Sequence, residues 1–346
     1  MKKKNITILV TGATGFLGRN ILMAFAKQPQ VDVIAACRDQ RKLTGVFEGQ
    51  VRTGDLRDPA YRQSVVQGID VICHTGTWAA MWNHKEEEQQ NFYAPSIDLI
   101  EQAIAAGVSR FLMTSTVAIT GQSQPGKKTD DFAKAAYTGF WPHLDYLIDI
   151  DRYMQANAHR GTQMITMRLG HFVGAGNTIG LVPALVPRLK SFLVPWLAGG
   201  NGRLPLVTDS DLGRSFIAAS FAESLSDYES FNICGMAFPT TREVIDYIAG
   251  KTGVPRPYYS VPFAIGHLFA WLMEILFPIL PGKAPFLTRS IVYLAENRVC
   301  ETDYAANKLG YRPQKSWQTG LDEALTELAK HNYPWPHLTQ KFTNQG

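Results

Sequence analysis

Three glycines spaced three residues apart, Gly12, Gly15 and Gly18, lie near the start of the chain. They follow a β-branched run at residues 6–10, typical of a buried parallel strand, and lead into a helical pattern at residues 16–27. The first glycine permits a tight turn, the second lets backbone N–H groups approach a pyrophosphate, and the third lets the helix pack closely. The pattern therefore predicts a dinucleotide-binding loop. The residues expected to hold the dinucleotide there are Gly12, Thr14, Gly15, Phe16, Leu17 and Gly18.

The residues after a second predicted strand, at 31–37, distinguish the two nicotinamide cofactors. An acidic residue there would bind the ribose 2′-hydroxyl of NAD, whereas an arginine accommodates the 2′-phosphate of NADP. Arg38 follows the strand directly, Lys42 comes shortly after, and the nearest carboxylate, Asp39, lies one position beyond Arg38. The sequence therefore favours NADP(H), with NAD(H) as the alternative, and we expect Arg38 and Lys42 to contact the cofactor.

Strands and helices that could position these residues alternate through the first half of the chain. Further strands are predicted at residues 51–56, 71–74, 110–116 and 164–169, and helices at 94–106 and 145–159. This alternation predicts an α/β fold with a doubly wound parallel sheet, whose ligand lies beyond the carboxyl ends of the strands.

The alternation stops after Gly174, where proline, glycine and large apolar residues predominate. One more strand and helix, at about 204–222, are expected to return to the sheet. The predicted dinucleotide-binding domain therefore covers residues 1–175, rejoined by 204–235. A smaller, mostly helical substrate lobe covers 176–203 and 236–330, and a C-terminal tail covers 331–346.

The composition is that of a globular protein, with 45% apolar residues, 18% charged residues and a net charge of +4 over 346 residues. No basic stripe or motif indicates a nucleic-acid partner. The four cysteines lack paired spacing, which favours reduced thiols in a cytoplasmic protein, and no secretory signal is evident. No residues have the spacing of a metal site. The three glutamates at residues 86–88 are expected to form a solvated face.

Residues 261–280 are strongly apolar, but they contain Pro262, His267, Glu274 and Pro278. About 20 apolar residues with few charges are needed to span a bilayer, so a membrane-spanning helix is not expected. Two alternatives remain, a wall of a hydrophobic substrate pocket and a helix lying on a membrane surface. The sequence favours the pocket wall.

The chain resembles the extended short-chain dehydrogenase/reductases from residue 5 to about residue 330. The resemblance rests on the glycines, Asp55-Leu56, Asn91 and the run Thr114-Ser-Thr116. Within that superfamily, residues 262–289 and 305–313 are most similar to the 3β-hydroxysteroid dehydrogenase branch. The resemblance implies a Rossmann-type sheet, a nicotinamide cofactor and a homodimer.

The resemblance also assigns roles to single residues. Asp55 matches the residue that meets the adenine amino group, Leu56 packs on the ring, and Gly76 lies beside the pyrophosphate and ribose. Thr116 matches the catalytic hydroxyl, and Tyr146 matches the acid/base that also contacts the cofactor. His171 follows the strand at 164–169, where the family chain passes the nicotinamide, so it is a candidate for proton chemistry.

The chain departs from the family at one catalytic position. The family has a lysine four residues after the tyrosine, where it lowers the tyrosine pKa, but here that residue is Ile150. Hydride transfer could persist with a substitute such as Arg152, although this residue projects away from the face of Tyr146. Alternatively, the fold could carry a redox-silent elimination, isomerisation or cyclisation, or bind a nucleotide or lipid without catalysis.

The leading hypothesis is an NADP(H)-dependent oxidoreductase that interconverts a hydroxyl and a ketone. Its substrate would be a hydrophobic small molecule such as a sterol, a fatty-acyl chain or a polyketide. The apolar stretches at residues 181–197 and 261–280 are the expected walls of the substrate pocket.

Overall fold

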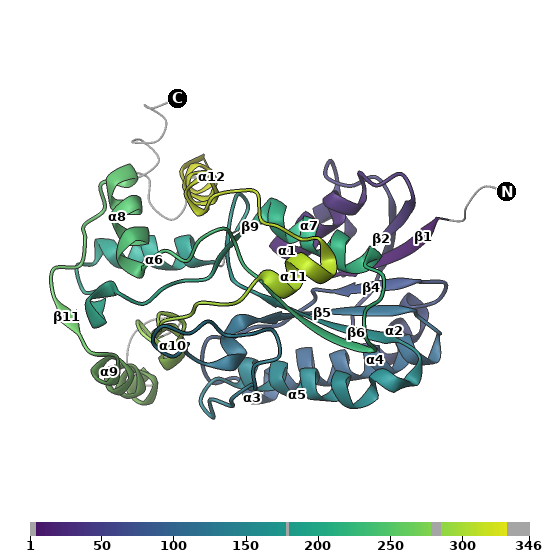
Figure 1. The fold of residues 1–346 in the computed structure, drawn as a ribbon, viewed down its shortest axis with the longest axis horizontal. Helices are drawn as coiled ribbons and strands as arrows, with labels where there is room; N and C mark the ends of the chain where they lie inside the picture. Colours follow the sequence, from purple (N-terminus) through teal and green to yellow (C-terminus); the bar gives the residue numbers. More distant parts are fainter. Residues whose placement is uncertain (1–4, 178–179, 278–284, 331–346) are drawn as a thin grey trace.

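The computed structural model describes residues 5–177, 180–277 and 285–330, so the tail proposed at 331–346 lies outside the described residues. A seven-stranded parallel sheet forms its centre, with the order β10-β6-β5-β4-β1-β2-β3 (Figure 1). The strands are β1 (Ile6–Thr11), β2 (Val31–Cys37), β3 (Gln50–Thr53), β4 (Val71–His74), β5 (Arg110–Thr116), β6 (Gln163–Leu169) and β10 (Tyr228–Ile233). The strand order reverses between β1 and β4, which confirms the predicted doubly wound Rossmann-type α/β fold.

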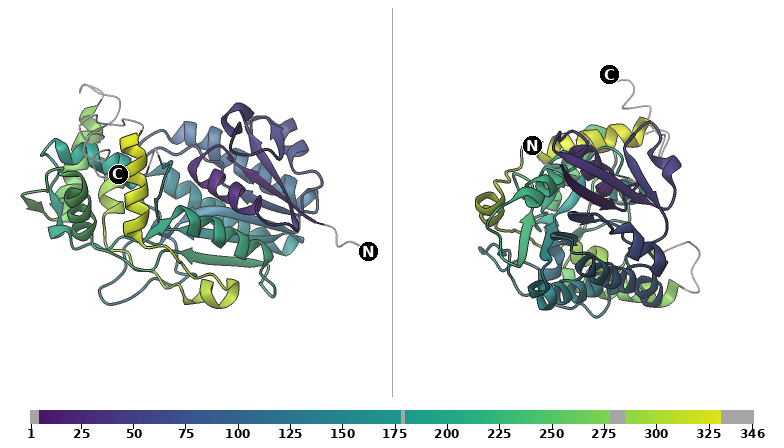
Figure 2. Two further views of the ribbon diagram at one scale, coloured as in Figure 1. Left: turned by 90° about the horizontal axis from the view of Figure 1, so that it is seen from above. Right: turned by 90° about the vertical axis from the view of Figure 1, so that its right-hand side faces the viewer.

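Helices cover both faces of this sheet (Figures 1 and 2). One face carries α1 (Phe16–Phe25), α7 (Asp209–Phe221) and α11 (Asp303–Leu309). The other face carries α2 (Pro59–Val65), α4 (Ala94–Ala105) and α5 (Pro142–Asn157). Because both faces are covered, the central strands are apolar on both sides, and Ile8, Leu9 and Val10 of β1 are all fully buried.

Helix α5 begins three residues earlier than the sequence pattern predicts, at Pro142 instead of residue 145. Proline is favoured in the first helical turn, because its missing N–H would have no helical partner there and its φ angle suits a helix. Leu144, Ile148 and Ile150 of this helix lie in the core that covers one face of the sheet. Ile150 is therefore a fully buried core residue.

The second part of the chain is mainly helical and has a core of its own. Its elements are β7 (His171–Val173), α6 (Leu181–Lys190), β8 (Trp196–Leu197), β9 (Leu206–Thr208), α8 (Thr241–Thr252), β11 (Ser260–Val261), α9 (Phe263–Leu276), α10 (Arg289–Leu294) and α12 (Trp317–Lys330). Side chains of α6, α8 and α12 form most of this core. The sequence pattern did not reveal α6, since Pro183 and Pro187 lie inside it.

Within the described residues no helix is long and apolar enough to cross a membrane. Helix α9 accounts for most of the apolar stretch that was weighed as a pocket wall. Its Gly266 and Ala270 are buried, whereas its largest aliphatic side chains are exposed. Only one face of α9 can therefore border a pocket inside the molecule.

A chain of hydrogen bonds joins the carboxyl ends of β1 and β4. Thr11 Oγ1 lies 2.7 Å from His74 Nδ1, and His74 Nε2 lies 3.0 Å from Ser96 Oγ, which donates to the carbonyl of Phe92. Thr11 Oγ1 also accepts from the N–H of Thr75. These contacts fit a neutral imidazole that carries its proton on Nε2. Burial lowers the pKa of His74 to about 4, so this neutral state persists at neutral pH.

Helices α1 and α7 approach closely at Gly213, and this contact gives a test of the packing. A Cβ atom at Gly213 would lie 2.8 Å from Ala24 Cβ and 3.1 Å from the Asn20 carbonyl oxygen. We expect Gly213→Ala to lower the free energy of unfolding by about 1–3 kcal/mol in urea titrations, because the helices must separate. The matched control is Gly250→Ala in α8, where no atom lies within 4 Å of the added Cβ. The control should raise that free energy by up to about 1 kcal/mol. If both substitutions changed the free energy of unfolding equally, the close packing at Gly213 would be contradicted.

The buried His74 predicts a pH-dependent stability. An unfolded histidine binds its proton near pH 6.5, whereas the folded His74 does so only near pH 4. The unfolded state therefore holds more protons between these values, and His74 alone should make the free energy of unfolding rise with pH by at most about 1.4 kcal/mol per unit. His74→Asn, which keeps a polar atom near Thr11, should reduce the measured slope by that amount between pH 4.5 and 6.5 in urea titrations. An unchanged slope would show that His74 titrates normally.

Candidate functional site

The three glycines form a tight cradle at the carboxyl ends of β1 and β4. Gly12 has a φ of +65°, and a Cβ atom there would lie 2.7 Å from the Cα of Gly76. A Cβ atom at Gly18 would lie 2.3 Å from the Gly12 carbonyl oxygen, so only glycine fits. A Cβ atom at Gly15 would meet only that same oxygen, at 3.3 Å. Gly12 and Gly18 are therefore required for packing, while Gly15 borders open space.

That open space lies at the start of α1, where an anion is favoured. Among the described residues no side chain caps α1, and its first turn holds no acidic residue. The N–H groups of the first turn and the positive end of the helix dipole are thus left for a phosphate. Leu17 is buried in the core and Phe16 stacks on Phe172 of β7, so both would act through their backbones. Thr14 lies half-buried in the same loop. The cradle fits a dinucleotide pyrophosphate.

The carboxylate nearest to the end of β2, that of Asp39, already forms an ion pair. Both oxygens of Asp39 accept from Arg41, at 2.8 and 3.0 Å, and this contact lowers the pKa of Asp39. Arg38 and Lys42 are exposed, and in the described part of the chain no hydrogen bond or ion pair engages the Arg38 guanidinium. This arrangement leaves the Arg38 guanidinium available to an anionic group of a bound dinucleotide.

The loops after β3 and β4 meet on the side of the cradle expected to bind adenine. The Leu56 side chain lies 3.3 Å from the Cβ position of Gly76. Asp55 accepts from the backbone N–H and the guanidinium of Arg57, which lowers the pKa of Asp55, and Arg38 adds to this effect. The structure thus brings Arg38, Asp55, Leu56 and Gly76 to one edge of the sheet.

Tyr146 lies on α5 and stacks on Tyr93, with ring centroids 4.8 Å apart. Its hydroxyl donates a long hydrogen bond, of 3.4 Å, to the Lys85 carbonyl oxygen. Partial burial, followed by the nearby Asp149, Tyr93 and Glu88, raises the pKa of Tyr146. The described residues place no cationic side chain in hydrogen-bonding contact with this hydroxyl.

The proposed substitute for the lysine does not reach Tyr146. Arg152 donates to the hydroxyl of Tyr137 at 2.9 Å and lies 4.6 Å from the centre of its ring. Tyr137 in turn donates to Asp149. This cluster is exposed on the outer side of α5, in agreement with the direction that helical spacing predicts for Arg152.

Thr116, at the end of β5, accepts from the N–H of Ala118 at 3.2 Å and so caps the short helix η3 (Val117–Thr120). Helix α5 packs against η3, which brings the elements that carry Thr116 and Tyr146 together. Tyr293 of α10 donates to the Ala118 carbonyl at 2.9 Å, so the second lobe also reaches this point. The Thr116 hydroxyl lies at the junction of the two parts of the molecule.

His171 lies in β7, after the carboxyl end of β6. Burial, assisted by the charge of Arg298, lowers the pKa of His171 to about 4. Its Nε2 atom is buried and has no hydrogen-bond partner among the described residues. A neutral imidazole cannot donate a proton as an imidazolium at neutral pH, so the geometry leaves His171 a hydrogen-bonding role at most.

Sequence reasoning missed Glu88, which was expected on a solvated face but is fully buried. Its carboxylate accepts from the Ala80 N–H at 2.7 Å and lies 3.0 Å from His143 Nδ1. The Trp141 indole donates to the Ala80 carbonyl. Glu88 thus ties the loop after β4 to the start of α5, next to Tyr146. A run of three glutamates carries no signal that one of them is buried.

Aromatic side chains gather where the two parts of the chain meet. Phe140 lies 6.1 Å from Tyr293 and 6.2 Å from His267 of α9, and Trp141 lies 6.4 Å from Tyr293 (ring centroids). Ser290 of α10 donates to the Met81 carbonyl in the loop after β4. These contacts form an aromatic junction between the two parts of the chain, where Arg289 and Arg298 stack on Phe140 and Tyr293.

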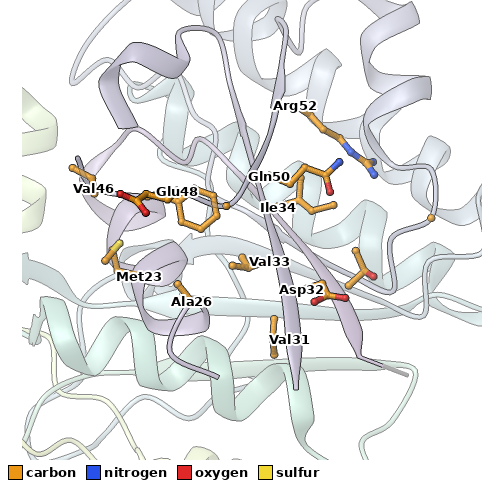
Figure 3. Close-up of a pocket in the computed structure, with 14 residues that line it drawn as sticks. Met23, Ala26, Val31, Asp32, Val33, Ile34, Val46, Glu48, Gln50 and Arg52 are labelled. Carbon is orange, nitrogen blue, oxygen red and sulfur yellow. The ribbon is translucent and has the colours of Figure 1, made fainter. Parts of the chain in front are cut away.

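A cavity of about 700 Å³ lies at the end of the sheet opposite the glycine cradle (Figure 3). It is lined by the start of β2, including Asp32 and Val33, and by Glu48 and Gln50 near β3. The Arg52 guanidinium beside it donates to the carbonyls of Val65 and Gln67. This cavity lies away from the glycine cradle, and the described residues hold no cluster of metal-ligating side chains.

Comparison with known proteins supports the assignment of the fold. The chain is 27% identical to a 2-alkyl-3-oxoalkanoate reductase of Stenotrophomonas maltophilia, covering 91% of this chain and 97% of that protein. It is 21% identical to 3beta-hydroxysteroid-dehydrogenase/decarboxylase isoform 1 of Arabidopsis thaliana, and the match covers 96% of this chain and 82% of that protein. Among solved structures, a UDP-glucose-4-epimerase from Stenotrophomonas maltophila with bound NAD has a TM-score of 0.73 at 14% identity, covering 95% and 99%.

The family assignment follows from a match over most of the chain. Residues 8–234 match the NAD dependent epimerase/dehydratase family, and this segment contains the glycine cradle, Thr116 and Tyr146. The expected resemblance to extended short-chain dehydrogenase/reductases of the 3β-hydroxysteroid dehydrogenase type is confirmed. The protein is therefore a member of the NAD-dependent epimerase/dehydratase family, an enzyme family of reductases, dehydrogenases and epimerases.

Proposed function

We propose that the protein is an NADP(H)-dependent reductase that converts a ketone into a hydroxyl on a hydrophobic substrate. The observation that carries this proposal is the environment of Tyr146, because the described residues place no cationic side chain in hydrogen-bonding contact with its hydroxyl and its pKa is raised. A phenol with a raised pKa stays protonated at neutral pH, so it can donate a proton but is a poor base. Reduction of a carbonyl needs a donor, whereas oxidation of an alcohol needs a base.

The roles of the other residues follow from their positions. NADPH, when bound, supplies the hydride for the carbonyl carbon. Tyr146 gives its proton to the carbonyl oxygen, and the Thr116 hydroxyl donates a hydrogen bond to the same oxygen. His171, as a neutral imidazole, serves to position the substrate or the cofactor. The glycine cradle, Asp55, Leu56 and Gly76 hold the dinucleotide.

The hydrophobic substrate is supported by the aromatic residues that border the junction, among them Trp141 and Tyr293. The names of the relatives agree with it, since one reduces a 2-alkyl-3-oxoalkanoate and the other acts on a hydroxysteroid. A sterol, a fatty-acyl chain or a polyketide would suit such a site.

The buried Ile150 also favours a second candidate, a redox-silent isomerase, lyase or cyclase. In that case the bound cofactor would be structural, and the reaction would proceed with no net change in absorbance at 340 nm. A transient change in this absorbance that returns to its starting value would instead indicate an epimerase, in which the substrate transfers a hydride to the cofactor and then takes it back.

Arg38 gives a test of the cofactor preference. We expect Arg38→Ala to weaken NADPH binding about 10- to 100-fold while NADH binding changes little, because only NADPH carries the 2′-phosphate. Isothermal titration calorimetry of both cofactors measures this. Arg160→Ala is the control, since this guanidinium binds Glu101 after the end of α5 and not at the end of β2, and it should change NADPH affinity by less than about fivefold. Equal affinity of the wild-type protein for the two cofactors would refute the NADP preference.

Tyr146 and Ile150 give a test of the chemistry. Tyr146→Phe should lower the rate of ketone reduction by about 10²–10⁴-fold, the contribution of a general acid, with NADPH affinity preserved. Ile150→Lys should raise alcohol oxidation at pH 7 at least about tenfold, because a nearby ammonium lowers the tyrosine pKa. Ile150→Met, similar in size but uncharged, should not.

Absorbance at 340 nm over pH 6–10 measures both directions. If Ile150→Lys fails to fold, the wild-type protein still gives a test. Its rate of alcohol oxidation should rise about tenfold per pH unit up to pH 9, because the deprotonated fraction of Tyr146 rises by that factor below its raised pKa. Full activity of Tyr146→Phe would remove the tyrosine from the mechanism.

A further inference from the structure

Helix α9 turns its apolar stripe toward solvent. Seven of its large side chains are 42–56% exposed, and most of them recur at helical spacings of three and four residues. They are Ile265, Leu268, Phe269, Trp271, Leu272, Ile275 and Leu276. On an ordinary surface helix this stripe would face the core and the polar residues would face water. In α9 the arrangement is reversed.

The polar side chains of α9 face the protein and are neutralised there. His267 Nε2 lies 2.9 Å from a carboxylate oxygen of Glu296. Glu274 accepts from the Arg289 backbone at 2.7 Å and from its guanidinium at 2.8 Å. Gly266 is buried, and a Cβ atom there would lie 2.9 Å from Leu197, so this side of the helix packs tightly. The outer side is left without a charged group.

Two loop tips continue the apolar surface beside α9. Phe192 and Leu193 are 58% and 60% exposed, and Tyr258 and Tyr259 are 74% and 39% exposed. The Tyr259 hydroxyl donates to the Leu193 carbonyl at 2.8 Å, and β11 leads from Tyr259 directly into α9. Phe192 has a φ of +61°, a conformation that a bulky side chain rarely adopts, and its ring remains exposed.

These eleven side chains define one surface, here called the α9 face. At their exposures it covers on the order of 1,000 Å², more than the roughly 300–600 Å² of the largest apolar patch on a typical monomer. Residues 190–202 and 256–273, which carry most of it, contain no aspartate or glutamate. Lys190 and Arg256 each precede a loop tip by two residues. The surface therefore combines apolar side chains with two flanking basic residues, of which Arg256 is paired with Asp246 at 2.6 Å.

We propose that the α9 face binds the surface of a phospholipid bilayer. A 14-residue helix is about 21 Å long, too short to span the bilayer core of about 30 Å, but it can lie in the plane of the interface. Trp271, Tyr258 and Tyr259 have the amphipathic rings that are enriched at this depth.

A protein partner fits the α9 face less well. Protein interfaces carry about one hydrogen bond per 100–200 Å². Among its eleven side chains, the α9 face offers the Trp271 indole and the Tyr258 hydroxyl for this purpose, since the Tyr259 hydroxyl already donates to Leu193. Helix α9 also lies at the end of the molecule opposite the β1–β3 edge, so a bilayer can approach it without touching the cofactor loops (Figure 1).

Flotation of the full-length protein with vesicles tests this proposal. The wild-type protein should float with phosphatidylcholine vesicles and somewhat better with vesicles containing 20% phosphatidylglycerol. Leu268→Glu combined with Leu272→Glu should reduce the bound fraction at least tenfold. Both positions are exposed, so the variant should keep the wild-type NADPH affinity and melting temperature.

Met236→Glu is the matched control, because Met236 is 63% exposed but lies outside the α9 face. It should float like the wild-type protein. Absence of flotation by the wild-type protein, or equal flotation of the double variant, overturns the proposal. If light scattering instead shows a dimer that the double variant abolishes, and neither protein floats, the occupant is a second copy of the chain.

Discussion

The close contact between the backbones that follow β1 and β4 is the constraint on which the cofactor site depends. Gly12, Gly18 and Gly76 approach so closely that no Cβ atom fits at Gly12 or Gly18. The buried chain from Thr11 through His74 to Ser96 holds the two strand ends together. Because this contact is made by backbone and by neutral, fully paired side chains, it keeps the start of α1 open for a phosphate without adding charge.

The same hydrogen-bond chain connects the cradle to Tyr146, the proposed proton donor. Ser96 donates to the carbonyl of Phe92, which lies in the π-helical turn Gln89–Tyr93 just before α4. Tyr93 of that turn stacks on Tyr146. Buried Glu88, at the start of the turn, holds the loop after β4 against α5. The position of Tyr146 is therefore set by the turn as well as by its own helix.

The proposed reductase depends on Ile150, which stands where the resemblance places the family lysine. An isoleucine at this position is compatible with the core, since Ile150 is fully buried among apolar neighbours. Without an ammonium nearby, partial burial and the carboxylates Asp149 and Glu88 raise the tyrosine pKa instead of lowering it. A raised pKa favours a tyrosine that donates its proton, which is the basis of the proposed reductase.

The sequence by itself determined the sheet, the glycine loop and the missing lysine, because these depend on local periodicity, backbone freedom and residue identity. It predicted six of the seven sheet strands separately. The expectation that the residues near 204–207 return to the sheet was wrong, because they form β9, which pairs with β7, and the seventh strand is β10. It could not show that Asp39 is held by Arg41, that Glu88 is buried or that His171 is neutral. Those properties depend on neighbours far along the chain and on exclusion of water. Only the tertiary structure decided that α9 faces its apolar stripe outward, because a helical pattern fixes which residues share a face but not which face meets the core.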